Sequence, residues 1–150
     1  MIGRLWEHTC LGSLARILYK FSWRKIEHIP DSQKLWRVVS TPQQIKKDGK
    51  PKPSFFRDST GLSCDLAIFT SIRKCKAGRL PEAGIVEFEV STVRSPAVGA
   101  DVGHKPVMVP RWNYAHCELT KVLTNDGISV LIQKHRYVVP QGFWPANTPR

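Results

Sequence analysis

The stretch that decides the fold class comprises residues 85–94, IVEFEVSTVR. Within it the apolar Val86 and Phe88 alternate with the acidic Glu87 and Glu89, which is the period-two pattern of a strand. Such a strand has one buried and one wetter face, as in an antiparallel sheet that covers a core on one side. We therefore predict a single strand over the whole stretch.

Shorter strand signals lie on both sides of this stretch. They are runs of β-branched and aromatic residues that end at turn residues. The resulting predicted strands are 35–39, 62–66, 106–110, 114–120 and 137–140. Between them, residues 41–54 carry prolines, a glycine and four lysines, so we expect an exposed loop with polyproline character. Residues 95–106 form a second predicted loop, rich in glycine and proline.

Three segments have helical spacing. Apolar residues from Leu11 to Phe21 recur at three- and four-residue intervals and predict an amphipathic helix over 10–26. A second helix follows the strand at 62–66 and ends before Gly78, and a third follows a cluster of capping residues at 124–127. Together these elements predict an α+β fold with a small, mostly antiparallel sheet and two or three helices.

The chain length of 150 residues is typical of one domain. We expect an N-terminal helical extension at 1–34, a single α+β domain at 35–140 and a tail at 141–150. The extension has three interpretations: a helix packed on the domain, a peripheral extension of it, or a basic helix on a membrane surface or nucleic acid.

Composition excludes several classes of protein. Hydrophobic residues make up 41% and charged residues 23%, which is ordinary globular composition, and no apolar run is long enough to span a bilayer. Arg16 interrupts the apolar segment near the N-terminus and no small-residue cleavage site follows, so we predict no signal peptide. The four cysteines form no C-x-x-C pair, so we expect reduced, mostly buried thiols, a cytoplasmic location, no metal site and no cofactor.

Charge is distributed unevenly along the chain, whose net charge is +11. Residues 1–80 hold sixteen Lys and Arg against six Asp and Glu, whereas residues 81–150 hold seven against six. We expect one basic face, which favours an anionic partner such as nucleic acid or an acidic protein. The candidate nucleic-acid contacts are Lys46, Lys47, Lys50, Lys52, Arg73, Lys74, Lys76 and Arg79.

Strong catalytic motifs are absent from the sequence: it has no phosphate-binding glycine loop, dinucleotide fingerprint, zinc-protease motif or nucleophile elbow. A weaker set of polar residues lies between apolar runs, where an Arg can bind a phosphate and an Asp or His can exchange a proton. Its members are Arg37, Arg57, Asp58, Ser63, Asp65 and His116. A third pattern interleaves aromatic residues with arginines, as in proteins that stack bases: Trp36, Trp112, Tyr114 and Trp144 with Arg37, Arg111 and Arg136.

From Leu35 onward, over about two-thirds of the chain, the order of short motifs resembles a family of short uncharacterised bacterial proteins. The motifs are LWRV (35–38), FRDS (56–59), LSCD (62–65), AHC (115–117) and RYVVP (136–140). The resemblance implies no activity and assigns no role to any of these residues.

Three hypotheses for function follow. The first is a non-catalytic basic module that contacts nucleic acid, as a subunit of a larger bacterial assembly. The second is a small enzyme that acts on a nucleotide or nucleic acid, of ADP-ribosyltransferase-like or hydrolytic type; it requires the six polar residues to converge in one pocket. The third is a protein-interaction subunit whose basic face meets an acidic partner. The sequence leaves open whether the protein is an enzyme.

Overall fold

A computed structural model describes residues 24–108 and 112–143 of the chain. Six strands in this part form one antiparallel sheet in the order β4-β5-β2-β1-β3-β6. The strands are β1 (Lys34–Val39), β2 (Ser63–Leu66), β3 (Gly84–Glu89), β4 (Val102–His104), β5 (His116–Leu119) and β6 (Arg136–Val139). The prediction of an α+β fold with a small antiparallel sheet is therefore confirmed.

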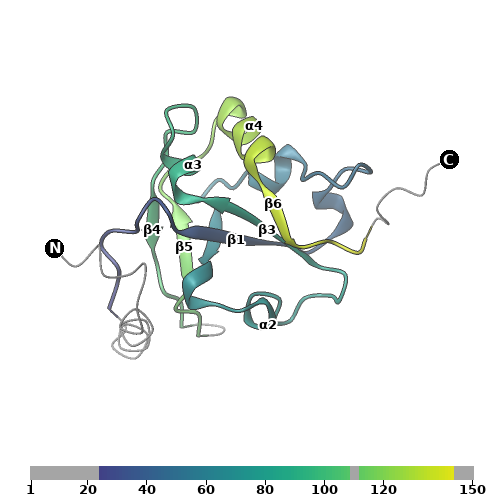
Figure 1. Cartoon of the computed structure of the whole chain (residues 1–150), viewed down its shortest axis with the longest axis horizontal. Helices are drawn as coiled ribbons and strands as arrows, with labels where there is room; N and C mark the ends of the chain where they lie inside the picture. The colour runs from purple at the N-terminus through teal and green to yellow at the C-terminus, as the bar shows by residue number, and fades with distance from the viewer. Residues whose placement is uncertain (1–23, 109–111, 144–150) are drawn as a thin grey trace.

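Three α-helices cover the sheet: α2 (Ile72–Cys75), α3 (Val90–Arg94) and α4 (Asn125–Lys134). Figure 1 shows α3 and α4 on one side of the sheet and α2 on the other. The Thr124 hydroxyl caps α4 by accepting a hydrogen bond from the Gly127 N–H, as the capping cluster predicts. Three short 3-10 helices, η1 (Pro42–Gln44), η2 (Pro53–Phe56) and η3 (Ala67–Phe69), lie in the connections.

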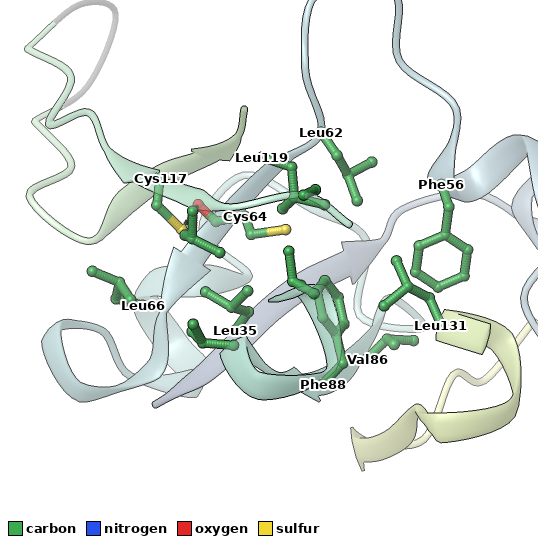
Figure 2. Packing of buried hydrophobic residues seen from close by; sticks show 14 of the residues in the cluster. Leu35, Phe56, Leu62, Cys64, Leu66, Val86, Phe88, Cys117, Leu119 and Leu131 are labelled. Atoms are coloured by element: carbon green, nitrogen blue, oxygen red, sulfur yellow. Dashed lines mark hydrogen bonds between the residues drawn. The ribbon is translucent and has the colours of Figure 1, made fainter. Parts of the chain in front are cut away.

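The main core lies between the sheet and the layer formed by η2, α3 and α4. Alternate residues of β1 and β3, such as Leu35 and Phe88, meet Phe56 from η2 and Leu131 from α4, and all four are at most 2% exposed. Figure 2 shows these side chains together with Cys64 and others from the neighbouring strands. The opposite face of the sheet carries the more polar residues of the same strands.

The predicted strand over 85–94 is wrong in its second half. The chain leaves the sheet after Glu89, and residues 90–94 form α3. The backbone N–H groups of Val90 and Ser91 donate to the carbonyls of Gln33 and Asp31, which redirects the chain away from the sheet. In the helix Val90 and Val93 are both buried, because residues three apart lie on the same face of a helix.

Two connections also differ from the prediction. The predicted loop at 95–106 contains β4, which pairs with β5 at the sheet edge. The predicted strand at 106–110 falls partly on residues outside the described part, and its described portion has one isolated bridge, between Val107 and Asn113.

The lysine-rich segment within 41–54 is a folded turn instead of an open loop. Ile45 and Pro51 form a bridge, and the Lys46 N–H donates to the Lys50 carbonyl. The Tyr137 hydroxyl of β6 donates to the Gly49 carbonyl, and this hydrogen bond holds the turn against the sheet. Here we call residues 45–51 the lysine turn.

Residues 24–33 are not helical, and they pack on the domain. Ile29 is 2% exposed and belongs to the core, and Arg94 donates to its carbonyl at 2.7 Å. The N–H of Ile26 donates to His104 Nδ1, and the Tyr114 hydroxyl donates to the Arg24 carbonyl. The predicted helix at 10–26 lies almost wholly outside the described residues, as does most of the predicted tail.

A Leu35→Ala substitution tests the core. Leu35 is 0% exposed, so we expect the free energy of unfolding to fall by about 2–5 kcal/mol, from lost transfer energy and the cavity that remains. Leu80 is 56% exposed, and Leu80→Ala should change stability by no more than about 0.5 kcal/mol. Urea unfolding of both variants measures the difference, and equal effects would contradict this core.

A pH series tests the anchoring of residues 24–33 through His104. Burial lowers the pKa of His104 below its ordinary 6.5, and its Nδ1 must stay unprotonated to accept from Ile26. The unfolded chain therefore binds this proton more readily than the folded protein. Stability should be fully present above pH 6.5 and should decline as the pH falls below that value.

Thermal melts between pH 7.5 and 5 should show that His104→Gln flattens this pH dependence. His28 is exposed, so His28→Gln is the matched control and should leave the slope unchanged. An identical slope in wild type and His104→Gln would show that His104 does not carry the effect.

Candidate functional site

A split in the sheet creates the candidate site. Strands β1 and β2 pair only at Leu35–Leu66 and Trp36–Asp65, and then β1 continues along β3 while Ser63 and Cys64 pair with β5. A cleft of about 630 Å³ adjoins this split, on the side of the sheet that η3 and α2 cover. Its volume is in the range of small-molecule sites in proteins.

Arg37 holds the two sides of the split together. Its Nη1 donates to the Ser63 carbonyl at 2.5 Å and its Nε donates to the Phe55 carbonyl at 3.1 Å. The guanidinium carbon lies 5.1 Å from the centre of the Phe55 ring. Among the described residues no carboxylate lies within ion-pair distance of Arg37, and Arg37 is one of the residues that line the cleft.

A row of polar residues crosses five strands on the cleft face. The strand register aligns His116, Asp65, Trp36, Glu87 and Arg136, from β5 to β6. The first three line the cleft. The last two continue the row beside Trp36, where Glu87 accepts from Trp36 Nε1 at 2.7 Å and from Arg136 Nε at 2.6 Å. Glu87 is 5% exposed, so this ion pair fixes one orientation of the indole ring.

Asp65 and His116 are direct cross-strand neighbours. Backbone hydrogen bonds join Leu66 to Ala115 and Leu119 to Leu62, so the alternation of the ladder makes Asp65–His116 a non-hydrogen-bonded pair. Such pairs bring their Cβ atoms to about 4.5–5.5 Å. A carboxylate and an imidazole therefore face one cleft side by side, a combination that can accept and donate protons.

Neutral donors hold the Asp65 carboxylate in place. Asn113 Nδ2 donates to Asp65 Oδ1 at 2.8 Å, and the Asn113 side-chain oxygen accepts from the Ala115 N–H at 3.1 Å. The Cys75 thiol is also hydrogen-bonded to the Asp65 carboxylate. Burial first, and then the charge and hydrogen bonding of Asp65, raise the pKa of Cys75 to about 12.

His116 has a carboxylate beside it on its own strand. Its Nε2 lies 3.5 Å from Glu118 Oε1, and Glu118 Oε2 lies 2.5 Å from the Lys105 ammonium. The hydrogen bond from Lys105 is the main cause that lowers the pKa of Glu118, and His116 adds to it. Glu118 does not line the cleft and acts on it through His116.

The cleft has a positive balance of charge. Arg37, Lys74 and Arg79 line it, and Asp65 is its one lining carboxylate among the described residues. Lys74 and Arg79 are exposed and lie at its α2 side, and neither is in an ion pair with a described carboxylate. Trp36, Trp112 and Tyr114 also line the cleft, so aromatic and cationic groups share its walls.

The structure brings together four of the six polar residues that the sequence indicated: Arg37, Ser63, Asp65 and His116 line the cleft. Arg57 and Asp58 do not line it. Arg57 Nη2 donates to Asn125 Oδ1 at 2.6 Å, and Asp58 accepts from the N–H and hydroxyl of Thr60. The Thr60 backbone hydrogen bond is the main cause that lowers the pKa of Asp58, so this pair of residues forms a surface turn.

The eight basic residues predicted to contact nucleic acid lie in two regions of the structure. Lys74 and Arg79 line the cleft, whereas Arg73 and Lys76 are on the same segment without lining it, and Lys76 donates to the Pro81 carbonyl. The other four belong to or follow the lysine turn and do not line the cleft: Lys46, Lys47, Lys50 and Lys52. Trp144 and Arg111 lie outside the described residues.

Sequence reasoning missed Asn113, Gln44 and Thr70, which line the cleft from three separate connections. Asn113 had a weak signal, since it lies between the predicted aromatic residues Trp112 and Tyr114. Gln44 and Thr70 had none. Gln44 ends η1 and Thr70 directly follows η3, and only the folded chain brings these two short 3-10 segments to the cleft.

Three thiols are buried and not disulfide-bonded: Cys64, Cys75 and Cys117. Burial raises the pKa of Cys64 to about 12 and raises that of Cys117 as well. Among the described residues, no three His, Cys, Asp or Glu side chains are grouped as metal ligands would be. No helix in the described part of the chain is long and apolar enough to cross a bilayer.

Comparison with known proteins finds no matching family model, no matching curated protein and no matching solved structure.

Thiol reactivity tests whether Cys75 can act as a nucleophile in the cleft. With a pKa of about 12 it is almost wholly protonated at pH 7.5, and the thiolate is the reactive form. In a Cys10→Ser variant, which leaves the three buried thiols, dithionitrobenzoate should react only as fast as the protein unfolds. The same protein in urea is the control for full reaction. Immediate release of one equivalent in the native protein, lost on Cys75→Ser, would reveal a reactive Cys75.

Proposed function

We propose that this protein binds nucleic acid and takes one nucleotide into the cleft at the sheet split. The observation that carries the proposal is the shared wall of aromatic and cationic groups in that cleft: Trp36 and Trp112 with Arg37, Lys74 and Arg79. Proteins that bind single strands combine these two kinds of group, aromatic rings for bases and cations for phosphates.

The cations support binding of phosphate. Arg37 already uses Nε and Nη1 to bind backbone carbonyls, so its position is fixed before a ligand arrives. A guanidinium held in this way loses little rotamer entropy when it also contacts a phosphate oxygen. Lys74 and Arg79 are exposed, and they add attraction that weakens with salt.

The aromatic residues support binding of a base. The indole of Trp36 is held by Glu87 and lies beside Asp65, and Trp112 is 49% exposed at the same cleft. Stacking of a base on such a ring contributes about 1–3 kcal/mol and tolerates any base. The two basic groups then have different roles. Lys74 and Arg79 contact the bound nucleotide, and the lysine turn adds to the positive electrostatic potential of the protein.

A second candidate is an enzyme that acts on the bound nucleotide, of ADP-ribosyltransferase-like or hydrolytic type. The observation that favours it is the pair of Asp65 and His116 facing the cleft from adjacent strands. A carboxylate can stabilise positive charge on a ribose ring as a glycosidic bond breaks, and a histidine can transfer a proton near neutral pH. Release of nicotinamide from NAD⁺, or shortening of an oligonucleotide, would support it if Asp65→Asn abolished the turnover.

Binding of a fluorescein-labelled single-stranded oligonucleotide tests the first proposal. Lys74→Ala with Arg79→Ala should weaken binding at 50 mM salt about tenfold or more, since hydrogen bonds to charged groups contribute about 1.5–3 kcal/mol before screening by solvent. Fluorescence anisotropy at 50 and 300 mM salt measures both the affinity and its salt dependence.

The matched control is Lys46→Ala with Lys47→Ala, which removes the same charge from exposed positions outside the cleft. We expect this control to weaken binding less than the cleft variant. Equal losses in the two variants would place binding on the basic surface in general, and no binding of wild type at 50 mM salt would overturn the proposal.

A further inference from the structure

We infer that the cleft selects ribonucleotides over deoxyribonucleotides, and that Asp65 is the residue that makes this selection by accepting a hydrogen bond from the ribose 2′-hydroxyl. The inference rests on the proposed function, because it concerns the nucleotide that the cleft takes in. It starts from the presence of one carboxylate in a cleft whose other charges are positive.

Asp65 has no cation as a partner among the described residues. The ion pairs of this part of the chain do not include it, and the groups that bond to its carboxylate, the Asn113 amide and the Cys75 thiol, are neutral. A carboxylate has about four acceptor positions on its two oxygens. The Asn113 amide and the Cys75 thiol use part of that capacity, so the partly exposed carboxylate can accept further hydrogen bonds from the cleft side.

The charge of Asp65 restricts which part of a nucleotide can approach it. A phosphate is repelled by a carboxylate and attracted to the cations that line the same cleft, which are Arg37, Lys74 and Arg79. The group that meets Asp65 must therefore be a neutral hydrogen-bond donor. In a nucleotide these donors are the ribose hydroxyls and the amino or imino groups of the base.

The register of the sheet favours the ribose over the base. Trp36 and Asp65 are cross-strand partners, which places their Cβ atoms about 4.5–5.5 Å apart on the same face. A base stacked on the Trp36 ring has its sugar at the ring edge, within reach of a neighbouring carboxylate. Acceptance of the 2′-hydroxyl by an acidic side chain is an established way to read a ribose.

Asn113 makes the acceptor rigid. It holds Asp65 Oδ1 at 2.8 Å while its own oxygen accepts from the Ala115 N–H, so the carboxylate is oriented before the ligand binds. Deoxyribose would leave this oriented charge without its partner, and an unpaired desolvated acceptor lowers affinity.

The test uses ten-nucleotide oligoadenylates that contain ribose, deoxyribose or 2′-O-methyl ribose. Fluorescence anisotropy measures the affinity of the full-length protein for each of them. We expect wild type to bind the ribose form about tenfold more tightly than the other two, as for one hydrogen bond to a charged group. Asp65→Asn should bring the ribose-to-deoxyribose ratio close to one. It should also bind the deoxyribose form at least as tightly as wild type, because a negative charge leaves a cationic cleft.

Asp126→Asn is the matched control, since it removes one exposed carboxylate that does not line the cleft, and it should keep the wild-type ratio. Asp65→Ser is a second variant in case the Asn variant folds poorly, which circular dichroism reveals. Oligoinosinate, which lacks the adenine amino group, distinguishes recognition of the base from recognition of the sugar.

Equal binding of ribose and deoxyribose forms by wild type would overturn the inference and leave the proposed function standing. If both Asp65 variants keep the wild-type ratio of ribose to deoxyribose affinity, the role of Asp65 is overturned. If wild type binds oligoinosinate more weakly than oligoadenylate and Asp65→Asn binds the two equally, Asp65 contacts the base and not the sugar. Failure of every oligonucleotide to bind at 50 mM salt would overturn the proposed function and the inference together.

Discussion

The structure depends on how Arg37 joins the two halves of a divided sheet. Beyond Trp36–Asp65 the β1 and β2 backbones no longer pair with each other, so carbonyls at the split need donors from elsewhere. Arg37 supplies two of them, to Ser63 and Phe55, and the split stays open without unsatisfied buried polar side-chain atoms in the described part of the chain. Because of this split, side chains from β1, β2 and β5 face a common space, and the site exists as a result of it.

The two faces of the sheet have different tasks. One face, with Leu35 and Phe88, packs against Leu131 of α4 to form the core and stabilises the fold. The other face carries the row from His116 to Arg136, in which Glu87 connects the partly exposed indole of Trp36 to the exposed guanidinium of Arg136. A polar row of this kind gains its order from mutual hydrogen bonds, so the residues that would meet a ligand are positioned by residues that the ligand never touches.

Only the structure shows where the basic residues lie relative to the cleft. In sequence, the lysines at 46–52 are the densest cluster, yet they form a turn fastened to β6 and stand apart from the cleft lining. Lys74 and Arg79 are fewer than these lysines, but they line the cleft, because α2 and the residues after it lie over the sheet on the cleft side. The local density of charge in the sequence therefore does not predict which basic residues line the cleft.

The sequence by itself determined the α+β class, the strands at 35–39 and 62–66, the capped helix after Thr124 and four of the cleft residues. These follow from the β-branched and aromatic content of short runs, from capping and from side-chain chemistry. It did not determine where the strand at 85–94 ends, since the turn after Glu89 depends on carbonyls of Gln33 and Asp31 more than fifty residues away. Nor did it distinguish Asp65, in the cleft, from Asp58, in a surface turn. Each aspartate has a serine within two residues in the sequence, Ser59 for Asp58 and Ser63 for Asp65. Only the register of β2 against β1 and β5 places Asp65 on the face where the sheet divides.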